Sequence, residues 1–148
     1  MEQYIGDKII YAEPMTRGEY NKFKGWTIPA NENPDDEGYI VKYSDSYISW
    51  SPKDVFEEAY CKTSGMTFGL AIAAMKKFGK RVARKGWNNG DMHLFYVSGA
   101  DYYMLANTDR LCGMERMSWI GIAIGNEKFG PWTPSQSDML TDDWYLIN

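Results

Sequence analysis

Two short segments each place a tryptophan beside side chains that can hold a nucleotide. The first runs from Arg84 to Asn88. Arg84 and Lys85 can pair with phosphates, the arginine as a bidentate fork. Trp87 offers a flat ring to a purine, a contact worth about 1–3 kcal/mol per base in single-strand binding proteins. The amide of Asn88, two residues after Gly86, matches an adenine edge. This segment therefore predicts an anion- and base-binding loop.

The second segment follows Trp132 and supplies hydroxyl and amide groups from Ser135 and Gln136. Asp138 is a candidate acceptor for a ribose hydroxyl. Helix capping by Ser135 or Asp138 is an equally open interpretation. For the first segment, residues 88–90 (Asn-Asn-Gly) are also the set that a tight turn demands. Both segments therefore allow a structural interpretation beside the functional one.

No recognisable catalytic or metal-binding set accompanies these segments. The single histidine, His93, lies in an alternating pattern typical of a packed strand. No serine has a nucleophile-elbow context, and no glycine-rich loop precedes a Walker lysine. Cys61 and Cys112 lack the spacing of a metal cluster, and Asp142 and Asp143 favour a turn before the last strand over a metal site. We expect no enzyme activity, no metal and no cofactor.

The overall composition constrains the partners. The chain has 148 residues, a net charge of −4, and 16% aromatic residues, including six tryptophans. An acidic balance argues against a nucleic-acid-binding surface, which needs a basic stripe, whereas one anionic ligand in a local pocket is compatible with it. No apolar run approaches eighteen residues, and no export signal opens the chain. We expect a protein of the cytoplasm with no membrane partner.

The elements that must position the two segments lie after a divide near residues 63–65, and we expect domains over residues 1–62 and 66–148. In the second, Thr67 caps a helix over 68–78 that Gly79 ends. Strands are predicted over 81–85, 92–97, 119–124, 128–132 and 144–147, which gives a helix packed on an antiparallel sheet. Residues 98–117 form a long loop or include a short helix around 102–108.

The front domain reads as a small β-α-β-β-α module, so the fold class is α+β. A strand is predicted over residues 8–12, and a helix over 17–24 is capped by Thr16 and ended by Gly25. Residues 39–43 and 47–50 form a hairpin. Ser51 is then the expected N-cap, and Pro52 the first residue, of a helix that runs to about residue 60.

Taken in order, the blocks Phe-Gly-x-Ala, Arg-Val-Ala-Arg-x-Gly-Trp-Asn and Trp-x-x-Ser-Gln-x-Asp-Met-Leu-x-x-Asp-Trp resemble the phage Thoeris anti-defence 2 family over about residues 66–148. The resemblance implies homotetramers that sequester cyclic ADP-ribose isomers, and for some members cyclic dinucleotides, intact in pockets between subunits. By matching position, the motifs comprise Arg84, Gly86, Trp87 and Asn88, and then Trp132, Ser135, Gln136, Asp138, Met139, Asp142 and Trp144. Trp144 begins an apolar strand and is expected in the core.

An alternative function of another class starts from the acidic residues 32–37. These carboxylates could mimic nucleic acid, which would make the chain a protein–protein inhibitor of a bacterial defence nuclease such as a Cas9-type effector. A solvated loop explains the same short run more simply.

The strand over residues 119–124 is apolar at nearly every position. Strands of this kind are buried on both faces, but one helix covers only one face of a sheet. We therefore expect a homo-oligomer with Ile120, Ile122 or Ile124 near a subunit contact that brings the Trp87 and Trp132 loops together. As a tip residue, Trp87 is expected to contribute little to the core.

Overall fold

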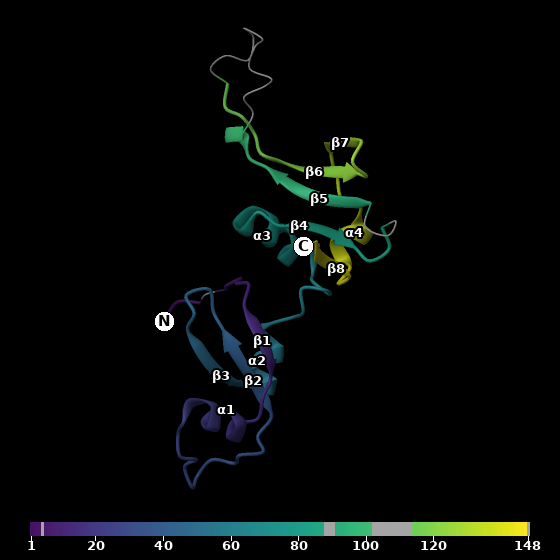
Figure 1. The fold of residues 1–148 in the computed structure, drawn as a ribbon. Coiled ribbons are helices and arrows are strands. Elements are labelled where there is room, and N and C mark those ends of the chain that lie inside the picture. The colour runs from purple at the N-terminus through teal and green to yellow at the C-terminus, as the bar shows by residue number, and fades with distance from the viewer. Residues whose placement is uncertain (4, 88–90, 102–113, 148) are drawn as a thin grey trace. The chain divides into compact units, whose positions relative to one another are not determined.

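The computed structural model describes residues 1–3, 5–87, 91–101 and 114–147. The chain divides into two units, Met1–Cys61 and Lys62–Asn148, each built around its own antiparallel sheet (Figure 1). Helices and sheets occur in both units, which confirms the predicted α+β class. Among the described residues, no helix is long and apolar enough to cross a membrane.

The front unit contains a three-stranded sheet in the order β1-β2-β3. Its first helix, α1, shows both predicted ends: the Thr16 side chain accepts from the Glu19 amide in a capping box, and Gly25 closes the helix at a φ of 70°. The elements are β1 (Tyr11–Pro14), α1 (Arg17–Lys24), β2 (Gly38–Lys42), β3 (Ile48–Pro52) and α2 (Lys53–Ala59).

Two local predictions for this unit were wrong. The first strand lies later than residues 8–12, because its pairing with β2 joins Tyr11 to Lys42 and Pro14 to Tyr39. Ser51 is not a helix cap, since it belongs to β3 and pairs with Tyr39. Pro52 takes the N-cap position of α2 and makes no side-chain cap hydrogen bond. The sheet ladder therefore extends to the residue at which the helix begins.

Arg17 of α1 holds the long loop before β2 through hydrogen bonds to Glu32. Arg17 donates to both carboxylate oxygens of Glu32, over 2.9 and 2.7 Å, and Asn21 donates to the same carboxylate over 3.0 Å. The Arg17 guanidinium also lies 5.1 Å from the centre of the Trp50 ring. Asn21 is buried, and its bond to Glu32 satisfies a polar group that burial would otherwise penalise.

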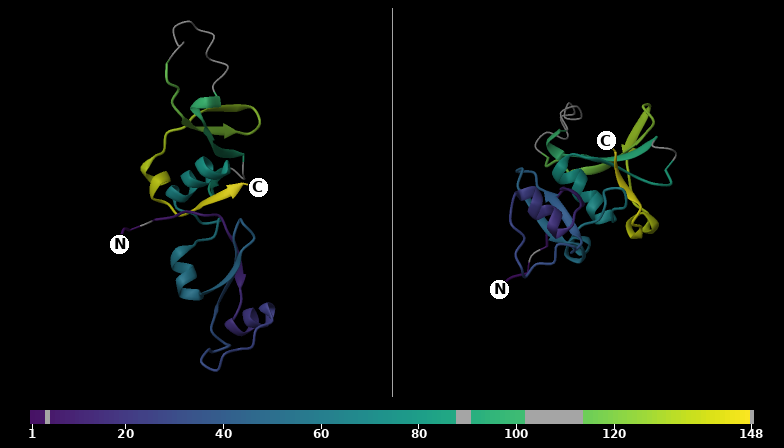
Figure 2. Two further views of the ribbon diagram at one scale, coloured as in Figure 1. Left: turned by 90° about the vertical axis from the view of Figure 1, so that its left-hand side faces the viewer. Right: turned by 60° about the horizontal axis from the view of Figure 1, so that its bottom comes forward.

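The second unit contains a five-stranded sheet in the order β7-β6-β5-β4-β8. Helix α3 is capped by Thr67 and ended by Gly79, as predicted, and packs against β4, β5 and β8. The hairpin of β6 and β7 can be followed in Figure 2. The elements are α3 (Phe68–Phe78), β4 (Arg81–Arg84), β5 (Met92–Val97), a 3-10 turn (Gly99–Asp101), β6 (Trp119–Ile124), β7 (Lys128–Pro131), α4 (Gln136–Leu140) and β8 (Trp144–Ile147). The short helix expected around residues 102–108 lies outside the described residues.

The core of this unit lies between α3 and the sheet. Its buried members are Met66, Ala71, Ala74, Met75, Val82, Leu94 and Trp144. Trp144 has no exposed surface, which confirms its assignment to the core. The helical spacing of Phe68, Ala71, Ile72, Met75 and Phe78 predicts one buried face, but Phe78 is 41% exposed at the end of α3.

Strand β6 divides its side chains between the two faces of the sheet. Ile120 and Ile122 pack against the core on the α3 side, because Ile122 pairs with the buried Leu94 and side chains alternate along a strand. Ile124, at the end of the strand, is 48% exposed. The opposite face holds the rings of Phe95 and Trp119, whose centres lie 6.3 Å apart.

The hydrogen bonds from Arg17 and Asn21 to Glu32 predict how the stability of the front unit depends on pH. The hydrogen bond from Arg17, then that from Asn21, lowers the pKa of Glu32 from 4.5 to about 2. A lowered pKa in the folded state stabilises the fold above pH 4.5, and this contribution is lost as the pH falls towards 2. In Glu32→Gln we expect faster hydrogen exchange in α1 at neutral pH and a weaker acid dependence. Asp35→Asn, at an exposed position of the same loop, is the control, and equal pH profiles for the two variants would contradict the prediction.

Candidate functional site

The two tryptophan segments predicted from the sequence meet in the second unit. Arg84 ends β4, and the chain then turns so that the Trp87 amide donates to the Arg84 carbonyl over 3.1 Å. Trp132 follows β7, and its amide donates to the Ile120 carbonyl over 2.9 Å. The rings of Trp87 and Trp132 lie 6.1 Å apart, so residues far apart in the sequence form one site.

Four aromatic rings pack together at this site: Phe68, Trp87, Trp132 and Trp144. Trp144 is at their centre, 5.4 Å from Trp87, 6.0 Å from Trp132 and 5.6 Å from Phe68. The three tryptophans meet nearly edge to face, at interplanar angles of 69–80°. The expectation that Trp87 contributes little to the core is therefore wrong, because its ring packs against the buried cluster.

Arg84, predicted to bind phosphate, is engaged by two carboxylates. Its Nε and Nη2 donate to the two oxygens of Asp143 over 2.9 and 3.1 Å, and its Nη1 donates to Asp138 over 2.9 Å. The arginine side chain is 20% exposed. These hydrogen bonds raise the pKa of Arg84, and the bond from Arg84 lowers the pKa of Asp143. All three groups are therefore ionised at neutral pH.

Ser135 and Asp138 form a capping box, the structural alternative considered above. One oxygen of Asp138 accepts from the Ser135 amide and hydroxyl, over 2.8 and 2.6 Å, and the other accepts from Arg84. Burial raises the pKa of Asp138, but the bonds from Ser135 and Arg84 outweigh it, and the pKa is lowered. The Trp144 indole donates to the Asp138 carbonyl over 2.9 Å. Both carboxylate oxygens of Asp138 are thus used within the fold.

Three of the other predicted site residues are exposed to solvent. Lys85, Gly86 and Gln136 are exposed, and the Lys85 amide donates to the Asp143 carbonyl over 3.3 Å. Asn88 lies outside the described residues. These exposed groups remain available to a ligand, in contrast to Arg84 and Asp138.

Sequence reasoning missed the roles of two residues at this site, Asp143 and Phe68. Asp143 was interpreted only as part of a turn, although it directly precedes a strand that pairs with β4. The register of that pairing places Arg84 opposite Trp144 and so brings Asp143 within reach of the arginine. The helical spacing of Phe68 predicts the buried face of α3, and its ring packs against the core, but the sequence does not show that this face ends at the tryptophans.

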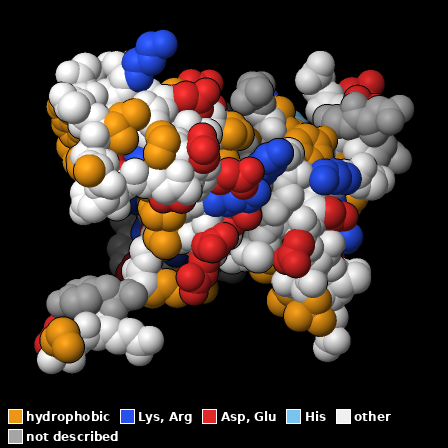
Figure 3. Space-filling view, turned by 90° about the horizontal axis from the view of Figure 1, so that it is seen from below, with side chains coloured by type: hydrophobic (Ala, Val, Ile, Leu, Met, Phe, Trp, Pro, Cys, Tyr) orange, Lys and Arg blue, Asp and Glu red, His pale blue; other side chains and the backbone are white. Residues whose placement is uncertain are grey.

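The acidic segment of the front unit bonds mainly to its own unit. Glu32 is held by Arg17, and Glu37 accepts from Lys53 over 2.6 Å. Asp36 accepts from Asn33 over 3.1 Å. On the molecular face in Figure 3, acidic side chains are interspersed with lysines and arginines. This arrangement does not resemble the continuous array of free carboxylates that mimicry of nucleic acid requires.

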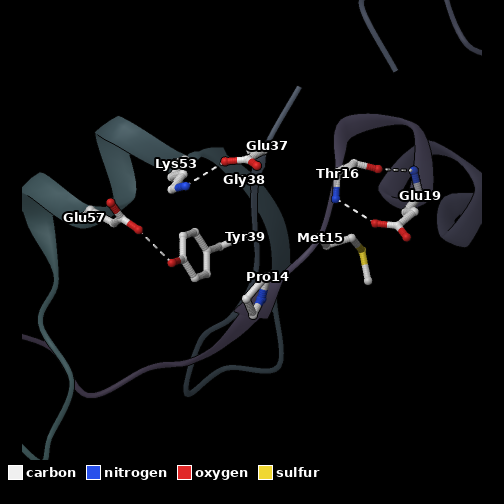
Figure 4. A pocket seen from close by; sticks show the side chains of 9 residues that line it. All are labelled: Pro14, Met15, Thr16, Glu19, Glu37, Gly38, Tyr39, Lys53 and Glu57. Carbon is white, nitrogen blue, oxygen red and sulfur yellow. Dashed lines mark hydrogen bonds and ion pairs between the residues drawn. The ribbon is translucent and has the colours of Figure 1, made fainter. Parts of the chain in front are cut away.

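A surface hollow of about 380 Å³ also lies in the front unit, between the start of α1, the start of β2 and helix α2 (Figure 4). Its carboxylates are bonded locally: Glu57 accepts from the Tyr39 hydroxyl over 2.9 Å, Glu37 pairs with Lys53, and Glu19 accepts from the Thr16 amide. Within the described part of the chain, no group of three or more metal-ligating side chains is placed to hold a metal ion.

The second unit is thus a small α+β domain in which an arginine, two aspartates and a tryptophan cluster join the ends of three strands and a short helix. The chain belongs to the family described as the Thoeris anti-defense 2-like domain, whose model matches residues 66–147. It is similar to Thoeris anti-defense 2 of Bacillus phage SP01, with 31% identity over 86 residues, which cover 56% of this chain and 96% of the relative.

The packing of Trp87 generates a prediction. Replacing a fully buried tryptophan or phenylalanine by alanine costs about 3–5 kcal/mol, and the partly buried Trp87 should lose roughly half of this. We expect Trp87→Ala to lower the free energy of unfolding by about 2 kcal/mol and Trp87→Phe, which keeps a ring, to lower it less. Denaturant unfolding of both variants measures this. Full stability of Trp87→Ala would show that the ring is not part of the core.

Proposed function

We propose that the chain is a phage anti-defence protein that binds nucleotide immune signals and holds them without cleaving them. The ligands of this proposal are cyclic ADP-ribose isomers, with cyclic dinucleotides as further candidates, and the place of action is the host cytoplasm. The observation that carries the proposal is that the family match covers the unit in which the two tryptophan segments meet.

The chemistry available at the site fits this ligand class. Tryptophan edges and faces provide apolar contact for a base, Lys85 supplies an exposed positive charge for a phosphate, and Gln136 supplies an amide donor and acceptor. A sequestering protein needs affinity and no turnover. Sub-micromolar binding corresponds to a free energy of about −8 kcal/mol or better, which one stacked base, one charge-assisted phosphate contact and a few hydrogen bonds can approach in an enclosed site.

The proposal is tested by recovering the ligand. The protein is mixed with cyclic ADP-ribose isomers or cyclic dinucleotides, freed of unbound nucleotide, and denatured by heat, and the released nucleotide is identified by mass spectrometry. We expect the intact cyclic compound. Thermal unfolding gives a parallel measurement, because ligand at 100 times its dissociation constant stabilises the fold by about 2.7 kcal/mol. Release of a linear or hydrolysed product would make the protein an enzyme instead.

We further propose that the site is completed in a homo-oligomer, with a tetramer as the expected form. Of the three predicted contact residues, Ile120 and Ile122 pack within the subunit and Ile124 is 48% exposed, and we place the main contact on the opposite face of the sheet. This face holds Phe95 and Trp119, and Phe129 adds a ring that is 75% exposed and 6.3 Å from Phe95. Phe95 and Trp119 are half-buried, so Phe129 is the exposed member of an apolar patch on this face, and such patches are typical of a protein–protein contact.

This location can be tested with one charged substitution and a matched control. Phe129→Asp should reduce the molar mass measured by light scattering, because a charge in a buried apolar contact is strongly unfavourable. Leu140→Asp changes an equally exposed apolar residue on α4, 81% exposed, and should leave the mass unchanged. A wild-type monomer that bound ligand at full strength would contradict the oligomer model.

A further inference from the structure

Arg84, Asp138 and Asp143 form a compact charged cluster that carries a net charge of −1. One guanidinium faces two carboxylates, and each of its three nitrogens donates to a carboxylate oxygen over 2.9–3.1 Å. The cluster is partly shielded from solvent, with side-chain exposures of 20% for Arg84, 14% for Asp138 and 31% for Asp143. An approaching phosphate therefore meets an arginine whose charge is already more than compensated.

The same cluster joins three elements of the second unit. Arg84 ends β4, Asp143 precedes β8, and Asp138 belongs to α4, whose start it caps with Ser135. Backbone bonds add to these ties, since the Trp144 indole donates to the Asp138 carbonyl and the Lys85 amide to the Asp143 carbonyl. Arg84 lies three residues before Trp87, and Asp143 directly precedes Trp144. The cluster is therefore close in the chain to both tryptophans.

We propose that Arg84, Asp138 and Asp143 are positioning residues, which lock α4 and the two tryptophan segments in one geometry, and that the phosphate of a bound nucleotide is read by Lys85 and not by Arg84. The cluster is the positioning latch of the site. The part of this inference that concerns the ligand rests on the proposed function. The part that concerns ring geometry does not.

The Arg84 guanidinium could either hold the two carboxylates or bind a phosphate. An arginine has five N–H donors in a rigid fork. To bind a phosphate in place of the carboxylates, Arg84 would leave Asp138 and Asp143 partly buried without their counter-charge, which is costly. Lys85 has no such obligation, since its side chain is exposed. Lys85, the next residue in the sequence, is therefore an exposed positive charge beside Arg84 that can meet an anion without leaving a buried carboxylate unpaired.

The geometric part is tested without ligand. Arg84→Gln, Asp143→Asn and the double variant are compared by thermal unfolding and by the near-ultraviolet circular dichroism of the folded proteins. We expect each single variant to lower the melting temperature and to change the tryptophan signal. The double variant should lose less than the sum of the two, because the residues act on each other. Unchanged tryptophan signals in all folded variants, or additive losses, would overturn the latch. If Arg84→Gln does not fold, the milder Asp138→Asn replaces it.

Whether Asp143→Asn strengthens or weakens ligand binding decides whether Arg84 contacts the phosphate. Asp143→Asn removes a carboxylate that competes for Arg84, so a phosphate-binding Arg84 would gain affinity for cyclic ADP-ribose. A positioning cluster instead predicts weaker binding, by about tenfold, which corresponds to about 1.4 kcal/mol. Lys85→Gln should weaken binding and reduce its salt dependence at unchanged melting temperature, whereas Lys76→Gln, an exposed lysine on α3, is the charge control.

These outcomes separate the two proposals. If the wild-type protein binds neither cyclic ADP-ribose isomers nor cyclic dinucleotides, the proposed function fails, while the ligand-free measurements still decide the latch. Tighter binding by Asp143→Asn, or full affinity of Lys85→Gln, would overturn the assignment of the phosphate to Lys85 and leave the proposed function standing.

Discussion

The burial of Trp144 is the constraint on which the second unit depends. The ring has no exposed surface and contacts three other aromatic rings. Its indole nitrogen donates to α4, and its backbone forms both hydrogen bonds with Met66, at the start of the unit, over 2.8 and 3.3 Å. A large ring buried this completely must satisfy its one polar atom inside the protein. The position of α4 is therefore determined by the core and not by the short helix itself.

The two units carry net charges of opposite sign. The acidic total of the chain therefore does not describe the unit that contains the candidate site. Met1–Cys61 holds twelve Asp and Glu against six Lys and Arg, a net charge of −6, whereas Lys62–Asn148 holds eight against ten, a net charge of +2. The total of −4 is thus carried by the front unit. A weakly positive unit is compatible with a small anionic ligand, and its modest charge still differs from the basic stripe of a nucleic-acid-binding domain.

The sequence predicted the elements whose ends carry chemical signals of their own. Thr16 with Gly25 and Thr67 with Gly79 define both ends of α1 and α3, because capping depends on residues within one turn. The Arg84 ion pairs could not be predicted, since their partners lie 54 and 59 residues away and depend on strand register. The residue types of both tryptophan segments indicated a site, but propensity alone cannot tell a carboxylate that caps a helix from one that meets a ligand.

The edge-to-face packing of the rings has a consequence for how a ligand could be enclosed. Sites for small molecules bury most of the ligand surface, yet Trp87 and Trp132 already share much of their surface with each other and with Trp144. On the proposed function, one subunit offers a nucleotide only the half-buried surface of these rings together with Lys85 and Gln136, which is a shallow contact. If a second copy supplies the remaining wall, binding and assembly become linked equilibria. Ligand would then stabilise the oligomer by the same free energy by which assembly strengthens ligand binding, so a protein that assembles weakly at low concentration would become a tighter trap as the signal accumulates.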